Sequence, residues 1–140
     1  MSEPSKAAFA FLDFKIVHFS FNELEDELTD ISININPSGK YFKSEGTFEV
    51  SLDFVAFEDS NKENEFIKIR LKSFYRFDKP IEYNEIPPYF YLNSVAIAFP
   101  YLRAFISNLT LQANIKPLIL PVLNLTGLDQ PLRENTTVVE

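Results

Sequence analysis

The sequence predicts an α+β fold in which a four-stranded antiparallel sheet is covered by one long helix. Two observations carry this prediction. The first 80 residues alternate apolar and polar side chains with a period of two, and the apolar residues after Pro88 recur at spacings of three and four. No helical segment separates the strand segments, so the fold is not built from βαβ units.

Three strand segments show the alternation clearly, at 31–36, 47–57 and 64–77. Their pattern is typical of a sheet with one packed face and one solvated face. We predict turns at 36–39, where Pro37 and Gly39 lie, and at the charged run 58–63. A meander and a Greek key both fit four such strands. In the central segment, the apolar set is Phe48, Val50, Leu52, Phe54 and Ala56.

The first strand, at 9–21, is less regular than the other three. Leu12, Phe14 and Ile16 are predicted to share one face, whereas Phe19 and Phe21 fall on the other. This change of phase near Val17 and His18 predicts a β-bulge or a change of partner strand, because one extra residue reverses the side on which all later side chains lie.

A helix is expected from Pro88 to Ala113, since proline is favoured in a first helical turn. Pro100 lies inside this pattern and should kink the helix. One apolar stripe would cover the sheet, and a second apolar side calls for another partner, most simply a second subunit. The residues of that second side are Tyr91, Ala98, Tyr101 and Phe105.

The segment 116–128 contains two prolines among leucines, which forbids a helix and predicts an extended chain lying on an apolar surface. We therefore expect a single domain over 1–128, followed by a polar, mobile tail over 129–140.

Composition argues for a binding or assembly protein rather than an enzyme. The net charge is −7 and there is no cysteine, which argues against nucleic-acid binding and excludes thiolate chemistry. His18 is the single histidine, and no second histidine is available for a metal site. We expect no catalytic residue, no metal and no cofactor. Without a signal peptide or an 18-residue apolar run, we expect a cytoplasmic protein with no membrane insertion.

The segment from Ala98 to Arg103, read with 117–128, resembles the SecB family of chaperones. That family has a Phe-Pro-Tyr-x-Arg signature in its main helix, followed by Pro-x-Leu-x-Leu and a Pro-Val-Asn-like element. Leu123 stands as a one-residue insertion in the last element. The residues that match the signature here are Phe99, Pro100, Tyr101, Arg103, Pro117, Pro121 and Asn124.

The resemblance implies a dimer of dimers, a tetramer with its helices between the sheets. It also implies an ATP-independent holdase that keeps unfolded or preprotein polypeptides in hydrophobic grooves, in protein export or in a toxin–antitoxin system. The alternative is an assembly module that keeps the fold without binding clients. The expected client-binding residues are Tyr41, Phe42, Phe74, Tyr75, Phe99, Leu118, Leu120, Val122 and Leu125.

Three departures from the family bear on the partner. By alignment, His18 and Arg70 stand where export members carry acidic residues that dock the SecA motor, and Phe74 and Tyr75 replace a glycine pair. The second helix of the family is shortened into 129–140. SecA is therefore a doubtful partner, and an antitoxin is the other candidate.

Overall fold

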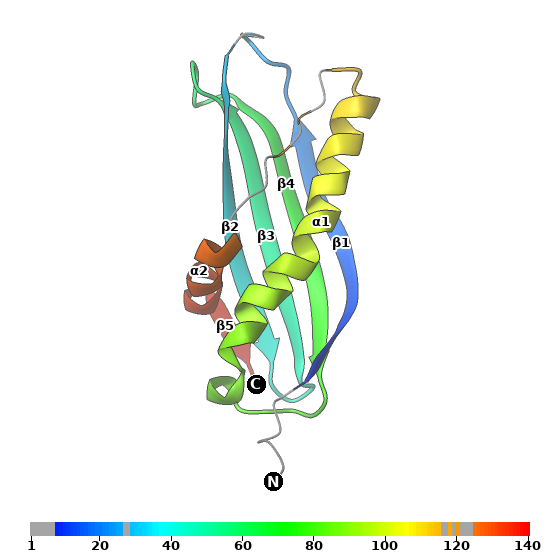
Figure 1. The fold of residues 1–140 in the computed structure, drawn as a ribbon, viewed down its shortest axis with the longest axis vertical. Helices are drawn as coiled ribbons and strands as arrows, with labels where there is room; N and C mark the ends of the chain where they lie inside the picture. Colours follow the sequence, from blue (N-terminus) through cyan, green and yellow to red (C-terminus); the bar gives the residue numbers. More distant parts are fainter. Residues whose placement is uncertain (1–7, 27–28, 116–117, 119, 121–124) are drawn as a thin grey trace.

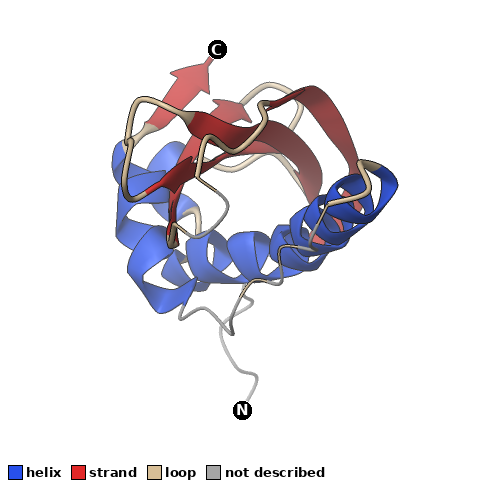
Figure 2. Ribbon diagram, turned by 90° about the horizontal axis from the view of Figure 1, so that it is seen from above, coloured by secondary structure: helices blue, strands red, loops and turns tan. Residues whose placement is uncertain are grey.

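The structure, a computed structural model, describes residues 8–26, 29–115, 118, 120 and 125–140. A five-stranded sheet in the order β1-β4-β3-β2-β5 forms one layer, and the helices lie on one of its sides (Figures 1 and 2). The elements are β1 (Phe9–Phe21), β2 (Ile31–Phe42), β3 (Thr47–Glu58), β4 (Glu65–Phe77), η1 (Tyr83–Glu85), α1 (Pro88–Gln112), η2 (Leu125–Leu128), α2 (Asp129–Glu134) and β5 (Thr136–Val139).

The first four strands pair antiparallel in a Greek-key order, because β2, β3 and β4 follow one another and β1 lies beside β4. The prediction of a four-stranded antiparallel sheet is wrong in one respect. A fifth strand, β5, pairs parallel to the end of β2 from Gly39 to Phe42, so the sheet is mixed.

The turn predicted at 36–39 is also wrong, because these residues continue β2 and pair with β3. The Gly39 N–H donates to the Asn135 carbonyl at 3.1 Å, toward β5. Pro37, two residues earlier, presents its nitrogen to the same edge, before the first residue paired with β5. Its missing N–H therefore breaks no ladder bond. The chain turns instead at 43–46, where Gly46 has a φ of 69°.

The bulge predicted near Val17 is present, and a second one lies at Leu12. Each bulge restores the phase of β1, so the aromatic side chains before and after it reach the same side of the sheet. Phe11 pairs with Tyr75 and Phe19 with Ile69, both of which are core residues. The two bulges thus let one irregular sequence supply a continuous apolar face.

The tail predicted to be mobile is part of the fold. Residues 129–140 form α2 and β5, and Leu132 is fully buried against the core. The prediction failed because four residues of parallel strand and one turn of helix show no periodicity in the sequence. The Asn135 and Val139 carbonyls accept bonds from the Gly39 and Lys43 N–H groups, which fixes the register of β5.

α1 begins at Pro88 and runs obliquely across the sheet to the side of β1 (Figure 1). It buries nine residues against the strands, among them Phe90 and Leu102. By length and composition this helix could cross a membrane, but the core helix of a soluble protein has the same properties. Pro100 lies inside the helix on its exposed side and supplies no N–H for the Ala96 carbonyl; Ala96 is itself an exposed residue.

Candidate functional site

The structure places the predicted client-binding residues in three different environments. Four of them are buried in the core, namely Tyr41, Tyr75, Phe99 and Leu120. Phe42 and Phe74 are half-buried on the outer face of the sheet, which α1 does not cover. Leu118 and Leu125 are half-buried near the helices. Val122 lies outside the described residues.

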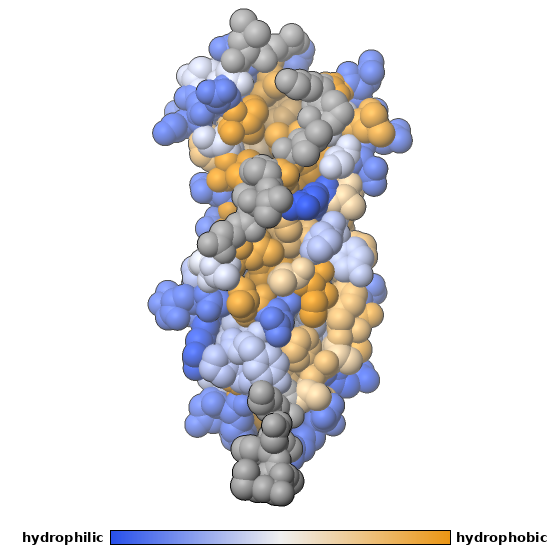
Figure 3. All heavy atoms as spheres, viewed as in Figure 1, coloured by the Kyte–Doolittle hydropathy of each residue, from blue (hydrophilic) through white to orange (hydrophobic). Residues whose placement is uncertain are grey.

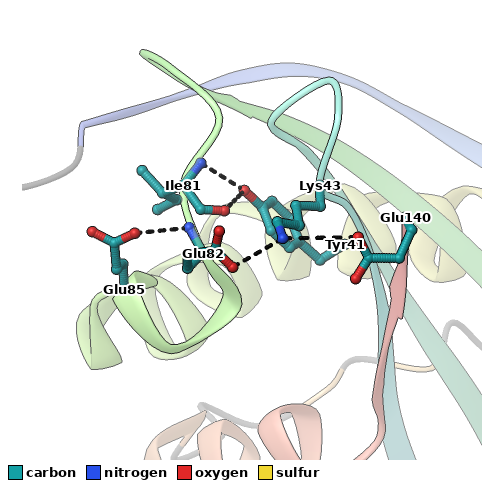
Figure 4. A network of polar contacts seen from close by, with 6 residues as sticks. All are labelled: Tyr41, Lys43, Ile81, Glu82, Glu85 and Glu140. Atoms are coloured by element: carbon teal, nitrogen blue, oxygen red, sulfur yellow. Dashed lines mark hydrogen bonds and ion pairs between the residues drawn. The ribbon is translucent and has the colours of Figure 1, made fainter.

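The buried tyrosines hold the fold together by hydrogen bonds. The Tyr41 hydroxyl donates to the Ile81 carbonyl at 2.6 Å and accepts from the Ile81 N–H at 3.1 Å (Figure 4). The Tyr75 hydroxyl donates to the Ser94 carbonyl in α1 at 2.7 Å. Burial raises the pKa of Tyr75 to about 12. Because both rings are fully enclosed, neither side chain is available to a ligand without opening the core.

An aromatic seam runs along the line where α1 meets β1. Tyr101 stacks on Phe14 with ring centroids 4.2 Å apart, and on Phe11 at 5.6 Å. Phe105 meets Phe19 edge to face at 5.4 Å. Phe19 remains 53% exposed and Tyr101 38%. The seam is therefore a candidate surface for contact with another molecule.

A second apolar surface lies on β2. We call it the β2 patch, and its residues are Ile31, Ile33 and Ile35, which face the helix side and are half-buried. α1 does not cover this surface fully, because its second half follows β1: Tyr101 and Phe105 contact β1 rings. Figure 3 shows apolar side chains gathered on this side of the molecule, in the half where β2 and the end of α1 lie.

Two leucines that follow α1, Leu118 and Leu120, both pack with the core. The Leu118 N–H donates to the Thr110 hydroxyl at 3.2 Å, which places Leu118 beside the last turn of α1. Leu120 is 5% exposed and belongs to the core. The predicted loop leucines thus border the apolar surface of the helix side, although they do not come together with Phe42 and Phe74.

The described part of the helix signature has a structural explanation. Phe99 is buried, and the Arg103 guanidinium lies 5.1 Å from its ring centroid. Pro100 is exposed and Tyr101 belongs to the aromatic seam. Pro117, Pro121 and Asn124 lie outside the described residues.

Within the described residues, no cluster of acidic and histidine side chains is placed to hold a metal. The carboxylate of Glu58 is enclosed at the tip of the sheet. It accepts from the Asp26 N–H at 2.8 Å and the Asn64 amide at 2.5 Å, and these bonds lower its pKa. A second polar group joins Lys43 to Glu82 at 3.0 Å and to Glu140 at 3.8 Å (Figure 4). Both groups tie loops to strands.

Sequence reasoning found one half of the aromatic seam and missed the other. The second apolar side of the helix correctly included Tyr101 and Phe105, whereas Tyr91 and Ala98 are core residues. The contribution of Phe11, Phe14 and Phe19 was hidden by the two bulges. Only a second phase change, at Leu12, could have indicated it.

No family model matches the chain. A protein of Methanocaldococcus jannaschii, uncharacterized protein MJ0357, is 34% identical over an alignment of 146 positions. The alignment covers 96% of this chain and 90% of that protein. Among solved structures, the SecB-like chaperone Rv1957 of Mycobacterium tuberculosis, in complex with a ChAD peptide from the Rv1956 HigA1 antitoxin, superimposes with a TM-score of 0.67. The match covers 83% of this chain and 88% of the chaperone at 15% identity. This chain therefore has the fold of a SecB-like chaperone.

Proposed function

We propose that this chain, which belongs to the same family as the M. jannaschii protein MJ0357, is an ATP-independent holdase chaperone that binds unfolded polypeptides. The observation that carries the proposal is the incompletely covered helix side of the sheet. There the three isoleucines of the β2 patch are only half-buried. A surface that binds by burying apolar area recognises clients by hydrophobicity rather than by sequence.

The fold supports this proposal, because a chaperone with the same fold was solved with an antitoxin peptide bound. An antitoxin segment is thus one client to consider here, and an unfolded or exported preprotein is another. The net charge of −7 would attract basic clients and help to keep a protein with exposed apolar surface in solution. Docking to SecA is disfavoured, since His18 and Arg70 carry no negative charge. We place the activity in the cytoplasm.

The aromatic seam fits a different occupant, a second copy of the chain. It flanks β1, a 13-residue edge strand whose outer side pairs with no strand among the described residues. The outward side of α1 carries the small residues Ala96 and Ala104, which allow close helix contact, and Arg103 is the single charge in the helix. Such a surface suits helices packed between two sheets, and a homotetramer would bury both the seam and this side of α1.

The proposed activity is tested by mixing the protein with a chemically unfolded client and measuring mass by size-exclusion chromatography with light scattering. A soluble complex of client and oligomer is expected, together with suppressed aggregation in the absence of ATP. If a stable oligomer leaves the client to aggregate, the alternative of an assembly module without client binding replaces the holdase.

The assembly is tested separately with Phe19→Asp, which introduces a charge into the exposed seam. Its matched control is Ser20→Asp, one residue along β1 on the opposite face. The first variant should lower the solution mass toward that of the 16.2 kDa chain, and the second should leave it unchanged. Equal masses for both variants and the wild type would remove the seam from the interface.

A further inference from the structure

The outer face of the sheet, opposite α1, places basic side chains directly across from one another. The register of β1 and β4 sets Lys15 opposite Lys72 and His18 opposite Arg70, and Lys68 follows opposite Ser20. Like charges that face each other on antiparallel strands destabilise the pair. In this fold, Lys15 and Lys72 form one such unfavourable pair on an exposed surface.

Carboxylates on the sheet neutralise only part of this charge. Asp53 of β3 binds Arg70 through two bonds, at 2.6 and 3.1 Å, and Glu49 lies 3.6 Å from Lys72. On β1, neither Lys15 nor His18 forms an ion pair with a described carboxylate. The Lys15 ammonium instead lies 5.9 Å from the centroid of the Phe74 ring. Lys15, the cation of β1 on this face, is thus open to an anionic group from outside.

Charge is distributed unevenly over the molecule. Six basic side chains share the outer face with four carboxylates, although the whole chain has a net charge of −7. The cationic face stands out against an acidic remainder, and a shallow depression lined by His18, Asp53 and Arg70 lies within it. The basic residues are Lys15, Lys40, Lys68, Arg70, Lys72 and Arg76, and the acidic ones are Asp13, Glu49, Asp53 and Glu65.

We infer that this face is a docking site for an acidic segment of a partner polypeptide. The segment lies along β1 and β4, and one of its carboxylates sits between Lys15 and Lys72, where it relieves their repulsion. A peptide is favoured over a nucleic acid because carboxylates are interleaved among the cations. A continuous run of phosphates would meet Glu49 and Asp53 as well as the lysines.

This site is independent of the holdase proposal, because it lies on the opposite face of the sheet from the β2 patch. The probe is a fluorescein-labelled peptide of alternating Glu and Ser, and its binding is measured by fluorescence anisotropy at low salt. The key variant is Lys15→Glu, which places an acidic residue opposite Lys72. Lys62→Glu, an exposed change in the loop before β4, makes the same change of net charge and is the control.

Lys15→Glu should weaken binding of the Glu peptide by about fivefold or more. Each exposed charge pair changes the affinity by a small factor, and this variant both removes an attractive pair and introduces a repulsive one. The same variant should raise the urea midpoint of unfolding, because it converts a repulsive pair into an attractive one. Lys62→Glu and the β2-patch variant Ile33→Asp should both leave peptide binding unchanged. An equal loss of affinity in Lys62→Glu, no measurable binding to wild type, or tighter binding of a single-stranded oligonucleotide would each overturn the inference.

Discussion

The hydroxyl of Tyr41 and the backbone of Ile81 form a closed pair of hydrogen bonds. The hydroxyl donates to the Ile81 carbonyl and accepts from its N–H, and both residues are buried (Figure 4). This pair joins the end of β2 to the segment that leads into α1. It therefore fixes where the helix starts, and with it the part of the sheet that the helix leaves open.

Tyr41→Phe should lower the free energy of unfolding by about 1–3 kcal/mol, because it leaves a buried N–H and a buried carbonyl without a partner. Urea denaturation measures this loss. The control is Tyr101→Phe, which removes the hydroxyl of a ring that is 38% exposed. Equal effects in the two variants would contradict the role given to the buried pair.

Gly39→Ala should destabilise the protein by about 1–3 kcal/mol through overpacking. A Cβ at this position would lie 2.7 Å from the Phe48 ring and 2.9 Å from the Thr136 hydroxyl. Gly127→Ala is the control, since nothing lies within 4 Å of its Cβ position. Thermal unfolding of the two variants should separate them. A stability of Gly39→Ala equal to wild type would contradict the close packing of Phe48 and Thr136 against Gly39.

Leu132→Ala should cost about 2–4 kcal/mol, because the side chain is fully buried and its removal leaves a cavity. Denaturation in urea gives the value, and Thr137→Ala, exposed on β5, serves as the control. A mobile C-terminal segment would instead tolerate Leu132→Ala with no change in stability.

Stability should fall in acid partly through Glu58. Its folded pKa lies below the ordinary value of 4.5, because the Asp26 N–H and the Asn64 amide bind its charged form. The stabilisation is therefore present above about pH 4.5 and is lost as the pH falls through the lower folded pKa. The difference in unfolding free energy between wild type and Glu58→Gln should shrink from pH 7 to pH 3. An unchanged difference would show that ionisation of Glu58 does not contribute.

Much of the fold could be read from local pattern. The limits of β1 follow from the alternation of apolar and polar residues, and the start of α1 follows from Pro88. The bulge at Val17 follows from the change of face between Phe14 and Phe19. The strand through Pro37 and Gly39 could not be read in this way. Pro37 is tolerated because its nitrogen faces the edge of β2, before the first residue paired with β5. Gly39 is required because Phe48 and Thr136, which are distant in sequence, lie close against it.

The candidate site was harder to predict than the fold. An aromatic side chain has the same local signal whether it fills the core, as Tyr41 does, or remains exposed, as Phe19 does. The oblique path of α1 decides between these outcomes, and it depends on long-range packing. The isoleucines of β2 were predicted as strand residues, but nothing in their sequence indicated that the helix would leave them half-exposed.

The most direct test of the holdase account compares Ile33→Asp with Asn34→Asp. These neighbours lie on opposite faces of β2, so the two variants place a carboxylate on the β2 patch or on the outer face. Ile33→Ser provides a milder change, and cooperative unfolding verifies that each variant folds. The measurement is light scattering of a chemically unfolded client during dilution. The account predicts that wild type and Asn34→Asp keep the client soluble, whereas the Ile33 variants allow aggregation. Full protection by a folded Ile33→Asp would contradict it.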